Sequence, residues 1–259
     1  MQAVLESGHL ALTNPDGTRG TRPFHMAMLE DRHIPEIMAL QEIILGRLRR
    51  KEMLQPFSLE FMKRHVRAQG RIFGVIVDER VVAFRNIFFP EPEDTEWNLG
   101  INLGFSRTDL VSVVNFQMVC VHPDFRGNNL ALRMNLQALR YLRAARTHRH
   151  VCATVSPYNY WNVRVLLESG FVIRNIKPKY GGKLRFIVYR NLDASRPDGI
   201  NEGVAVMIGD IPRQAELLQA GFSGIGINMT PEFHIAMSSD PIWHGPEMYN
   251  GCEVVYARV

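Results

Sequence analysis

The chain has 259 residues, of which 46% are hydrophobic, 22% charged and 9% aromatic. This composition is typical of a globular protein with a sizeable core, and it excludes a disordered chain, a collagen-like fibre and a disulfide-based scaffold. The 30 Lys and Arg against 26 Asp and Glu give a net charge of +4. That charge permits an anionic ligand but is far below the dense basic patches of nucleic-acid-binding proteins.

Nothing in the sequence predicts export or membrane insertion. The N-terminal segment lacks the basic and apolar regions of a secretory signal, and no apolar run approaches the roughly 20 residues that a membrane helix needs. Cys120, Cys152 and Cys252 are odd in number and have no metal-like spacing. We therefore expect a cytoplasmic protein whose cysteines are small core residues and which holds no metal.

The first third of the chain is expected to begin with a loose extension over residues 1–23 and then to fold. Apolar residues at helical spacing predict two helices, and two β-branched runs split by Asp78-Glu79-Arg80 predict a hairpin. The expected elements are a strand at Phe24–Met28, helices at Ile34–Leu48 and Leu59–Ala68, and strands at Ile72–Val77 and Val81–Phe89.

An irregular stretch, Pro90–Asp109, follows the hairpin. It contains a small acidic cluster of Glu91, Glu93, Asp94 and Glu96. A solvated loop is the simpler interpretation of this cluster, and a segment that faces the substrate is the alternative.

From residue 113 onward, strands and helices alternate. This alternation predicts an α/β fold in which helices cover a mixed sheet, and no internal repeat with a period of about 20–50 residues is visible. A Gly181-Gly182 turn joins the last two strands of this region. The expected elements are Val113–Val121, Leu130–Ala145, Val151–Val155, Tyr160–Glu168, Phe171–Ile176 and Arg185–Tyr189.

The chain changes character after Leu192, and the segment from position 193 to the C-terminus is a predicted α/β extension. We expect a strand at Val204–Ile208, a helix between Asp210 and Gly221, and a strand at Glu253–Arg258. Its apolar residues predict that it packs on the core (Leu217, Leu218, Phe222, Ile225 and Ile227). The expected division is therefore 1–23, a core over 24–192, and 193–259.

The segment between the strand Val113–Val121 and the helix Leu130–Ala145 predicts an anion site. Backbone N–H groups are free at a helix N-terminus, and the helix dipole adds about half a positive charge there. Gly127 permits close approach of a ligand to the backbone, and Arg126 adds a cation with forked donors. Phosphate or pyrophosphate is the ligand that these groups favour.

Two motifs in this region resemble the GNAT superfamily of N-acetyltransferases. Arg126-Gly-Asn-Asn-Leu-Ala131 is similar to the family's acetyl-CoA loop, Arg/Gln-x-x-Gly-x-Gly/Ala. Asn129 stands where Gly is usual, and Asn tolerates left-handed backbone better than most residues. A helix from Asn159 to Gly170-Phe171 resembles the family's Asn-led helix, with the Asn and the Gly at the family's spacing. The resemblance covers residues 24–192 and is tightest over 116–171.

The resemblance implies a GNAT-like mixed sheet with flanking helices and acetyl-CoA as acyl donor. Val119, Cys120 and Val121 would meet the pantetheine arm, with the N–H of Val119 facing the thioester carbonyl. Asn159 would bond the pantetheine, and Asn162 would lie near the thiol end. The pyrophosphate would be held by Arg126, Gly127, Asn128, Asn129, Leu130 and Ala131.

The positions that often supply acid or base in this family hold no ionisable group here. Leu166 replaces the usual Tyr, and Asn115, Gln117 and Thr154 occupy the other positions. Tyr180 is therefore our candidate proton donor, and Gln117 is a candidate for orienting a water molecule or the substrate. Further candidates for the acid or base are Tyr158, Tyr160, Glu93, Asp94 and Glu96.

The leading functional hypothesis is an acyl-CoA-dependent N-acyltransferase, which transfers acetyl to a primary amine of a small molecule or a protein by direct attack. A catalytically silent CoA-binding or regulatory protein is the first alternative. A nucleic-acid-binding module is the second, although a solvated face explains its basic helix more simply (Arg133, Arg140, Arg143, Arg146 and Arg149). His122, His148 and His150 have no partners at metal-ligand spacing. The sequence leaves a homodimer open and does not identify the amine.

Overall fold

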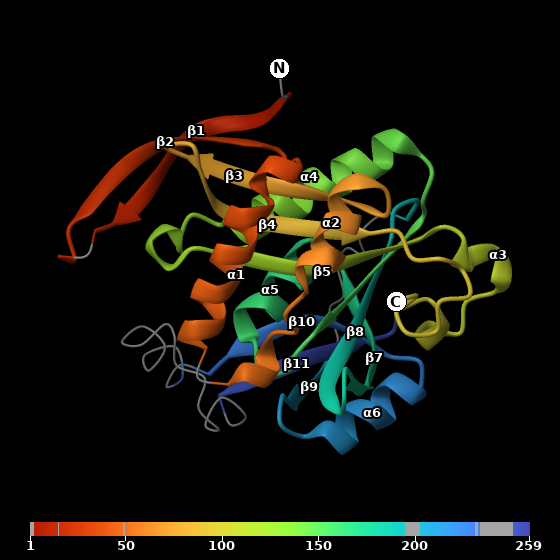
Figure 1. The fold of residues 1–259 in the computed structure, drawn as a ribbon. Coiled ribbons are helices and arrows are strands. Elements are labelled where there is room, and N and C mark those ends of the chain that lie inside the picture. Colours follow the sequence, from red (N-terminus) through yellow and green to blue (C-terminus); the bar gives the residue numbers. More distant parts are fainter. Residues whose placement is uncertain (1–2, 15, 49, 195–202, 231–232, 234–250) are drawn as a thin grey trace. The chain divides into compact units, whose positions relative to one another are not determined.

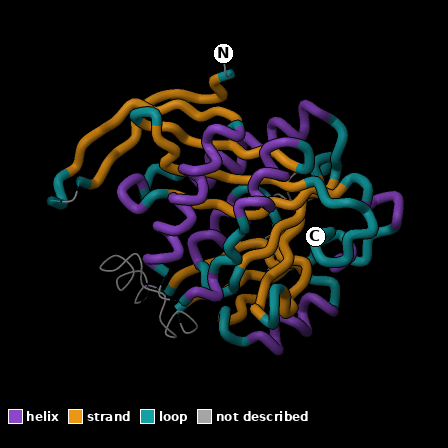
Figure 2. The backbone as a smooth tube through the Cα atoms, in the orientation of Figure 1, coloured by secondary structure: helices purple, strands orange, loops and turns teal. Residues whose placement is uncertain are grey.

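A computed structural model describes residues 3–14, 16–48, 50–194, 203–230, 233 and 251–259 (Figures 1 and 2). The chain divides into two compact units, each built from several segments. Unit 1 consists of Met1–Arg47, Gln55–Glu91 and Val114–His148, and unit 2 consists of Leu48–Leu54, Pro92–Val113 and Arg149–Val259. None of the helices in the described ranges has both the length and the apolar character that crossing a membrane requires.

Unit 1 has five strands that pair in chain order, each antiparallel to the next. They are β1 (Val4–Thr13), β2 (Arg19–Met28), β3 (Gly70–Val77), β4 (Arg80–Phe88) and β5 (Val113–Val121). The helices of this unit are α1 (Ile34–Arg47), α2 (Leu59–Arg67) and α4 (Leu130–Ala145). The predicted hairpin and all three predicted helices are confirmed, with ends that differ by a residue or two.

The expectation of a loose start at residues 1–23 was wrong. Residues 4–13 form β1, which pairs with β2 over its whole length (Figure 1). Leu10 is fully buried and packs with Phe24, Phe125 and Leu130. Glu6, Ser7, Gly8 and His9 interrupt the apolar residues of this segment, so it lacks a regular alternation. Its burial comes from tertiary contacts with residues that are far away along the chain, which local patterns do not reveal.

Unit 2 has six strands in the order β6-β8-β7-β10-β11-β9. The first three are β6 (His150–Val155), β7 (Val172–Lys179) and β8 (Lys183–Asn191), and the rest are β9 (Val204–Met207), β10 (Ser223–Met229) and β11 (Cys252–Ala257). Each of these neighbouring pairs is antiparallel. The helices of this unit are α3 (Arg107–Leu110), α5 (Tyr160–Glu168) and α6 (Ile211–Gln219).

The segment after residue 192 contains the predicted strands, as β9 and β11, and the predicted helix, as α6. β10 was not predicted from the sequence, because Gly224 and Gly226 dilute its β-branched pattern. The proposed division of the chain at residues 23 and 192 remains a prediction.

Candidate functional site

The loop from Arg126 to Ala131 lies in unit 1, between β5 and α4. A short 3-10 turn, Pro123–Phe125, leads into it. Gly127 and Asn129 both have left-handed backbone, with φ of 83° and 53°. The side chain of Asn129, the residue that precedes α4, makes no capping hydrogen bond to the helix. The first-turn N–H groups of α4 therefore have no side-chain acceptor at the cap, which favours an anion there.

The replacement of Gly by Asn in the loop has a geometric explanation. Asn129 adopts φ 53° and ψ 25°, a conformation in which Gly and Asn are tolerated and β-branched residues are strained. The loop therefore keeps the left-handed turn that the family pattern would supply with Gly.

Several cations surround this loop. Partial desolvation lowers the pKa of Arg126, and the charge of Arg47 lowers it further. Burial also lowers the pKa of His122, an effect that Asp124 opposes and that Arg47, Arg80 and Arg126 reinforce. Asp124 is the counter-charge, 3.6 Å from His122 Nδ1. Three guanidinium groups thus lie near enough to this imidazole to lower its pKa, and such a group of cations favours an anionic ligand.

Asn128 joins the loop to the N-terminal hairpin. Its Oδ1 accepts from the N–H of Ala11 at 2.8 Å, and its Nδ2 donates to the carbonyl oxygens of Ala11 at 2.8 Å and Phe125 at 2.9 Å. In the first turn of α4, Arg133 pairs with Glu6 of β1 at 2.6 Å. The side chain of Asn128 is thus occupied by hydrogen bonds, two of whose partner atoms belong to β1. Only the backbone of Asn128 is available for the predicted contact with the ligand.

Replacing Asn128 with Ala is expected to loosen the loop. The variant loses three hydrogen bonds, of which two tie the loop to β1, and we expect CoA affinity to fall by about tenfold, equivalent to about 1.4 kcal/mol. Isothermal titration calorimetry with CoA measures this. Asn14→Ala, which removes an exposed amide at the β1–β2 turn, is the matched control. Unchanged affinity in Asn128→Ala would show that β1 does not support the loop.

Substitutions at Asn129 test the left-handed turn directly. Asn129→Gly is expected to retain CoA binding, because Gly adopts this conformation freely. Asn129→Val places a β-branched residue at positive φ, which costs roughly 1–2 kcal/mol and predicts a roughly 5- to 30-fold loss of affinity. The same titration compares the two, and equal affinities would contradict the role given to this turn.

β5 leads into the loop and contains an irregularity in its pairing with β4. Arg85 lies opposite Val119, whereas Ile87 lies opposite Phe116. Two β5 residues, Gln117 and Met118, therefore face one residue of β4, Asn86, and the Oδ1 of Asn86 accepts from the Met118 N–H at 2.8 Å. Such bulges re-aim a strand and are frequent beside functional sites.

The predicted cofactor residues of β5 lie directly beyond this bulge. The side chains of Val119 and Val121 are partly buried against the core cluster that contains Phe125 and Leu130. Cys120 is buried, and burial raises the pKa of its thiol to about 12, so its side chain is inert at neutral pH. The three cysteines are free and buried, as expected. Gln117 is partly exposed.

The other predicted group of site residues belongs to unit 2. Asn159 precedes α5, and its Oδ1 accepts from the N–H of Asn162 at 3.2 Å, which caps the helix. The Oδ1 of Asn162 is buried and has no hydrogen-bond partner among the described residues. Leu166, at the position of the family's usual Tyr, is 1% exposed. An unpartnered buried amide oxygen near the start of α5 is a place where a donor on a ligand could bind.

Tyr180 lies beside Thr154, one of the positions where an ionisable group is missing. Its hydroxyl and the Oγ1 of Thr154 are 3.1 Å apart. The Trp97 ring lies 6.1 Å away, centroid to centroid, and the Arg185 guanidinium 6.0 Å from the Tyr180 ring. Burial raises the pKa of Tyr180, although the Thr154 hydrogen bond and the charge of Arg185 oppose the shift. This phenol therefore stays protonated at neutral pH and is suited to donate a proton, not to accept one.

The other candidate acids and bases have different surroundings. Tyr158 lies under the Arg50 guanidinium at 4.5 Å, and Tyr160 is buried against Trp161. In the acidic loop, Glu93 pairs with Arg107 at 2.7 Å, and Asp94 Oδ1 accepts from the backbone of Glu96 and Trp97. These carboxylates stabilise the loop itself, which favours a solvated loop over a segment that faces the substrate.

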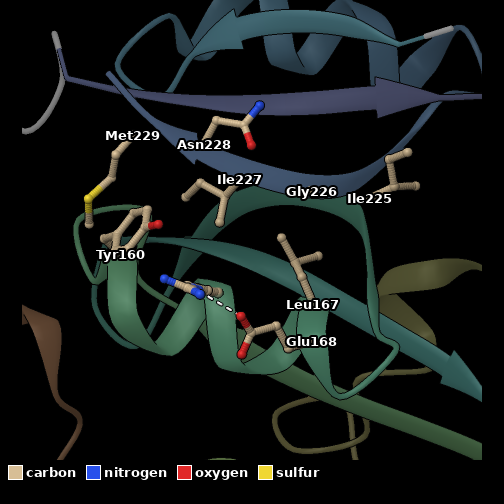
Figure 3. A pocket seen from close by; sticks show the side chains of 9 residues that line it. Tyr160, Leu167, Glu168, Ile225, Gly226, Ile227, Asn228 and Met229 are labelled. Atoms are coloured by element: carbon tan, nitrogen blue, oxygen red, sulfur yellow. Dashed lines mark hydrogen bonds and ion pairs between the residues drawn. The ribbon is translucent and has the colours of Figure 1, made fainter. Parts of the chain in front are cut away.

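A pocket that was not predicted from the sequence lies between α5 and β10 in unit 2. It has a volume of ≈ 670 Å³, and Figure 3 shows Tyr160 and Leu167 on the helix facing Ile227 and Met229 on the strand. Arg164 and Glu168, which form an ion pair at 2.7 Å, lie along the same side of α5. Because β10 was not predicted, no local pattern pointed to this pocket.

Two of the histidines considered above are engaged by aromatic side chains. His150 Nδ1 is 2.9 Å from the Tyr189 hydroxyl, and His148 stacks on Phe89. Across the described ranges, no group of three or more His, Cys, Asp or Glu side chains is arranged to hold a metal ion.

Solved structures that resemble this chain in fold include a GNAT-family acetyltransferase and two proteins in complex with acetyl-CoA. NAA60 of Arabidopsis thaliana in complex with acetyl-CoA matches 66% of this chain and 99% of its own, with a TM-score of 0.54 and 11% identity. A GNAT-family acetyltransferase from Streptococcus pneumoniae matches 65% and 98%, with a TM-score of 0.50 and 12% identity. AAC(6')-Ib in complex with parmomycin and acetyl-CoA matches 68% and 99%, with a TM-score of 0.50 and 11% identity.

No family model and no curated protein matches the sequence. The likeness to solved structures shows the fold: over about two thirds of its length, the chain has the mixed α/β fold of GNAT acetyltransferases. The fold class predicted from the two motifs is confirmed.

Proposed function

We propose that the chain is an acyl-CoA-dependent N-acyltransferase that moves an acetyl group from acetyl-CoA to a primary amine of a small molecule or a protein. The observation that carries this proposal is the loop at residues 126–131. There, left-handed backbone at Gly127 and Asn129 leads into an uncapped helix, beside the charges of Arg126, Arg47 and Arg80. A CoA pyrophosphate is the anion that this loop would bind within a GNAT fold.

In the proposed reaction, the amine nitrogen attacks the thioester carbonyl carbon with its lone pair, the C–N bond forms and the C–S bond breaks. The departing thiolate takes a proton, and the amine gives one up to water. The Val119 N–H would donate to the carbonyl oxygen as it gains charge. The Tyr180 hydroxyl would supply the thiolate proton, in place of the Tyr that is absent at Leu166.

Binding of CoA is the first test of this proposal. A preformed phosphate loop of this kind predicts a Kd in the micromolar range, which is on the order of −8 kcal/mol. If calorimetry detects no heat of CoA binding at millimolar ligand, the proposal of an acyl-CoA-dependent enzyme is wrong.

Catalysis is tested separately by release of CoA thiol from acetyl-CoA in the presence of a panel of small amines and peptides. Amine-dependent release supports the enzyme. CoA binding without release by any amine favours the alternative, a CoA-binding regulatory protein. One observation favours this alternative. The positions that often supply the acid or base hold no ionisable group (Asn115, Gln117, Thr154 and Leu166).

A further inference from the structure

Two segments of unit 2 share a short sequence pattern. Leu166-Leu167-x-x-Gly170-Phe171 recurs as Leu217-Leu218-x-x-Gly221-Phe222. The capping residues Asn159 and Asp210 are separated by the same number of positions as Gly170 and Gly221, and we call this separation the repeat offset. It lies just beyond the periods of about 20–50 residues in which no repeat was visible. So short a pattern is not enough to establish a repeat without structure.

The helices of the two segments have the same local geometry. α5 and α6 each span 9 residues, and each is capped by a side chain that accepts from a backbone N–H three residues later, at 3.2 Å for Asn159 and 3.1 Å for Asp210. Gly170 and Gly221 then turn the chain with φ of 82° and 85°. The N–H of Phe171 donates to Leu166 O at 3.1 Å, and that of Phe222 to Leu217 O at 3.0 Å.

The strands repeat as well, with the same register and the same bulge. In the first segment β7 pairs with β8, with Arg174 extra between Ile173 and Asn175. In the second, β10 pairs with β11, with Ile225 extra between Gly224 and Gly226. Arg174 and Ile225 are separated by the repeat offset, so the two bulges occupy equivalent positions.

The first strand of each segment pairs with the last strand of that segment. β6 pairs with β8 through Ala153 and Val188, and β9 pairs with β11 through Val204 and Tyr256. Ala153 and Val204 are separated by the repeat offset, whereas Val188 and Tyr256 are further apart along the chain. The second segment is therefore the same strand–helix–strand–strand motif, with a longer connection before its final strand.

The two motifs meet as a symmetric pair. β7 pairs antiparallel with β10 through Ile173 and Gly224, and these two residues are counterparts at the repeat offset. In an antiparallel pair, a residue lies opposite its own counterpart only where a two-fold axis passes between the strands. The helices obey the same relation, because α5 contacts β10 and α6 contacts β7.

Side chains at this axis are complementary in size. A Cβ on Gly224 would lie 2.9 Å from the Cβ and the Cδ1 of Ile173, so Gly224 provides the space that the Ile173 side chain fills. Gly226, two positions further on, has no such neighbour, since a Cβ there would be 3.7 Å from the nearest atom.

The second motif retains the pairing surface of the first but not the candidate cofactor residues. Asp210 replaces Asn159, and Arg213 replaces Asn162. Only residues 192–203 separate β8 from β9, which is too short for counterparts of β5, the loop and α4. The second motif thus keeps what is needed for docking and lacks what the first motif would use to bind CoA.

We propose that β9, α6, β10 and β11 are an internal second copy of the motif that β6, α5, β7 and β8 form at residues 150–191. In this view, the edge of β7 is a strand-pairing surface that is specific for this motif. The copy within the same chain occupies that edge in place of a second subunit. This inference does not depend on the proposed enzymatic function.

A disulfide across the axis tests the pairing in the full-length chain. Residues directly opposite each other in an antiparallel pair have Cα atoms about 4.5–5.5 Å apart, within disulfide range. Ile173→Cys with Gly224→Cys is expected to form an intramolecular bond under mild oxidation, seen by intact mass and non-reducing electrophoresis. Ile173→Cys with Gly226→Cys is the control and is expected to form little. Disulfide-linked dimers from Ile173→Cys alone would show that β7 pairs between chains and would overturn the proposal.

An exchange of residues across the axis tests the symmetry itself. Gly224→Ile alone is expected to lower Tm by on the order of 5 °C by overpacking. Adding Ile173→Gly exchanges the two counterparts, and a two-fold relation predicts that most of the loss is recovered. A double variant no more stable than Gly224→Ile would contradict the relation. If Gly224→Ile does not fold, two milder variants give the same comparison. These are the single variant Gly224→Ala and the double variant that combines Gly224→Ala with Ile173→Ala.

Discussion

Reversing the charge at position 126 is expected to abolish measurable CoA binding. Arg126→Glu replaces a guanidinium with a carboxylate at the N-terminus of α4, where the pyrophosphate would lie. The variant loses a charge-assisted hydrogen bond and adds like-charge repulsion, so we expect a loss of roughly 100-fold or more in affinity, equivalent to about 3 kcal/mol. Calorimetric titration with CoA at low and at physiological salt measures the loss.

Arg140→Glu is the matched control for this prediction. It makes the same change of net charge on the same helix at an exposed residue, and its place further along the helix puts it about 15 Å from the loop. We expect its affinity to change by less than about threefold, because an exposed charge at that distance is screened. Equal losses in the two variants would mean that net charge, and not the loop, governs binding.

Removing the hydroxyl of Tyr180 is expected to reduce kcat with little change in KM. Tyr180→Phe keeps the ring beside Trp97 and Arg185 but deletes the proposed proton donor, and a positioned general acid contributes a factor of roughly 10²–10⁴. A change confined to kcat would indicate an interaction made only in the transition state. The assay is amine-dependent thiol release with the best substrate from the panel.

The pH profile gives this prediction a second readout. Burial raises the pKa of Tyr180 above its ordinary value of 10.0, so the protonated acid persists at neutral pH and is lost only as the pH rises through that raised value. Rates of the unmodified protein should therefore show no alkaline loss attributable to Tyr180 until the pH exceeds the ordinary value for a phenol. Tyr189→Phe, which removes a hydroxyl bonded to His150, is the control. A kcat in Tyr180→Phe equal to that of Tyr189→Phe would exclude Tyr180 as the acid.

Local sequence patterns predicted much of the fold correctly. Helical periodicity located α1, α2, α4 and α5, and Asp210 with Gly221 located α6, because caps and apolar spacing act within a few residues. The position of the loop at residues 126–131 was also predictable, since it lies in one contiguous segment between a strand and a helix, and its phosphate-binding role stays a prediction. The tolerance of Asn at position 129 followed from backbone preference alone, and the observed φ agrees with it.

Long-range contacts decided the rest. β1 is a strand because Leu10 packs against Phe125 and Leu130, and because Asn128 bonds its backbone; none of these residues is near it in sequence. The contact of the Tyr180 hydroxyl with Thr154, at 3.1 Å, likewise joins two different strand–turn segments and is not visible in local patterns. The pairing of β7 with β10 depends on the register between two strands that are distant in sequence. Register is set by the contacts between both strands, so neither strand's sequence specifies it alone. The sequence by itself thus determined the helices and most strands, and it predicted an anion loop at residues 126–131. Tertiary packing decided how the N-terminal hairpin contacts those residues and how β7 pairs with β10, because packing energies belong to pairs of segments and not to either segment alone.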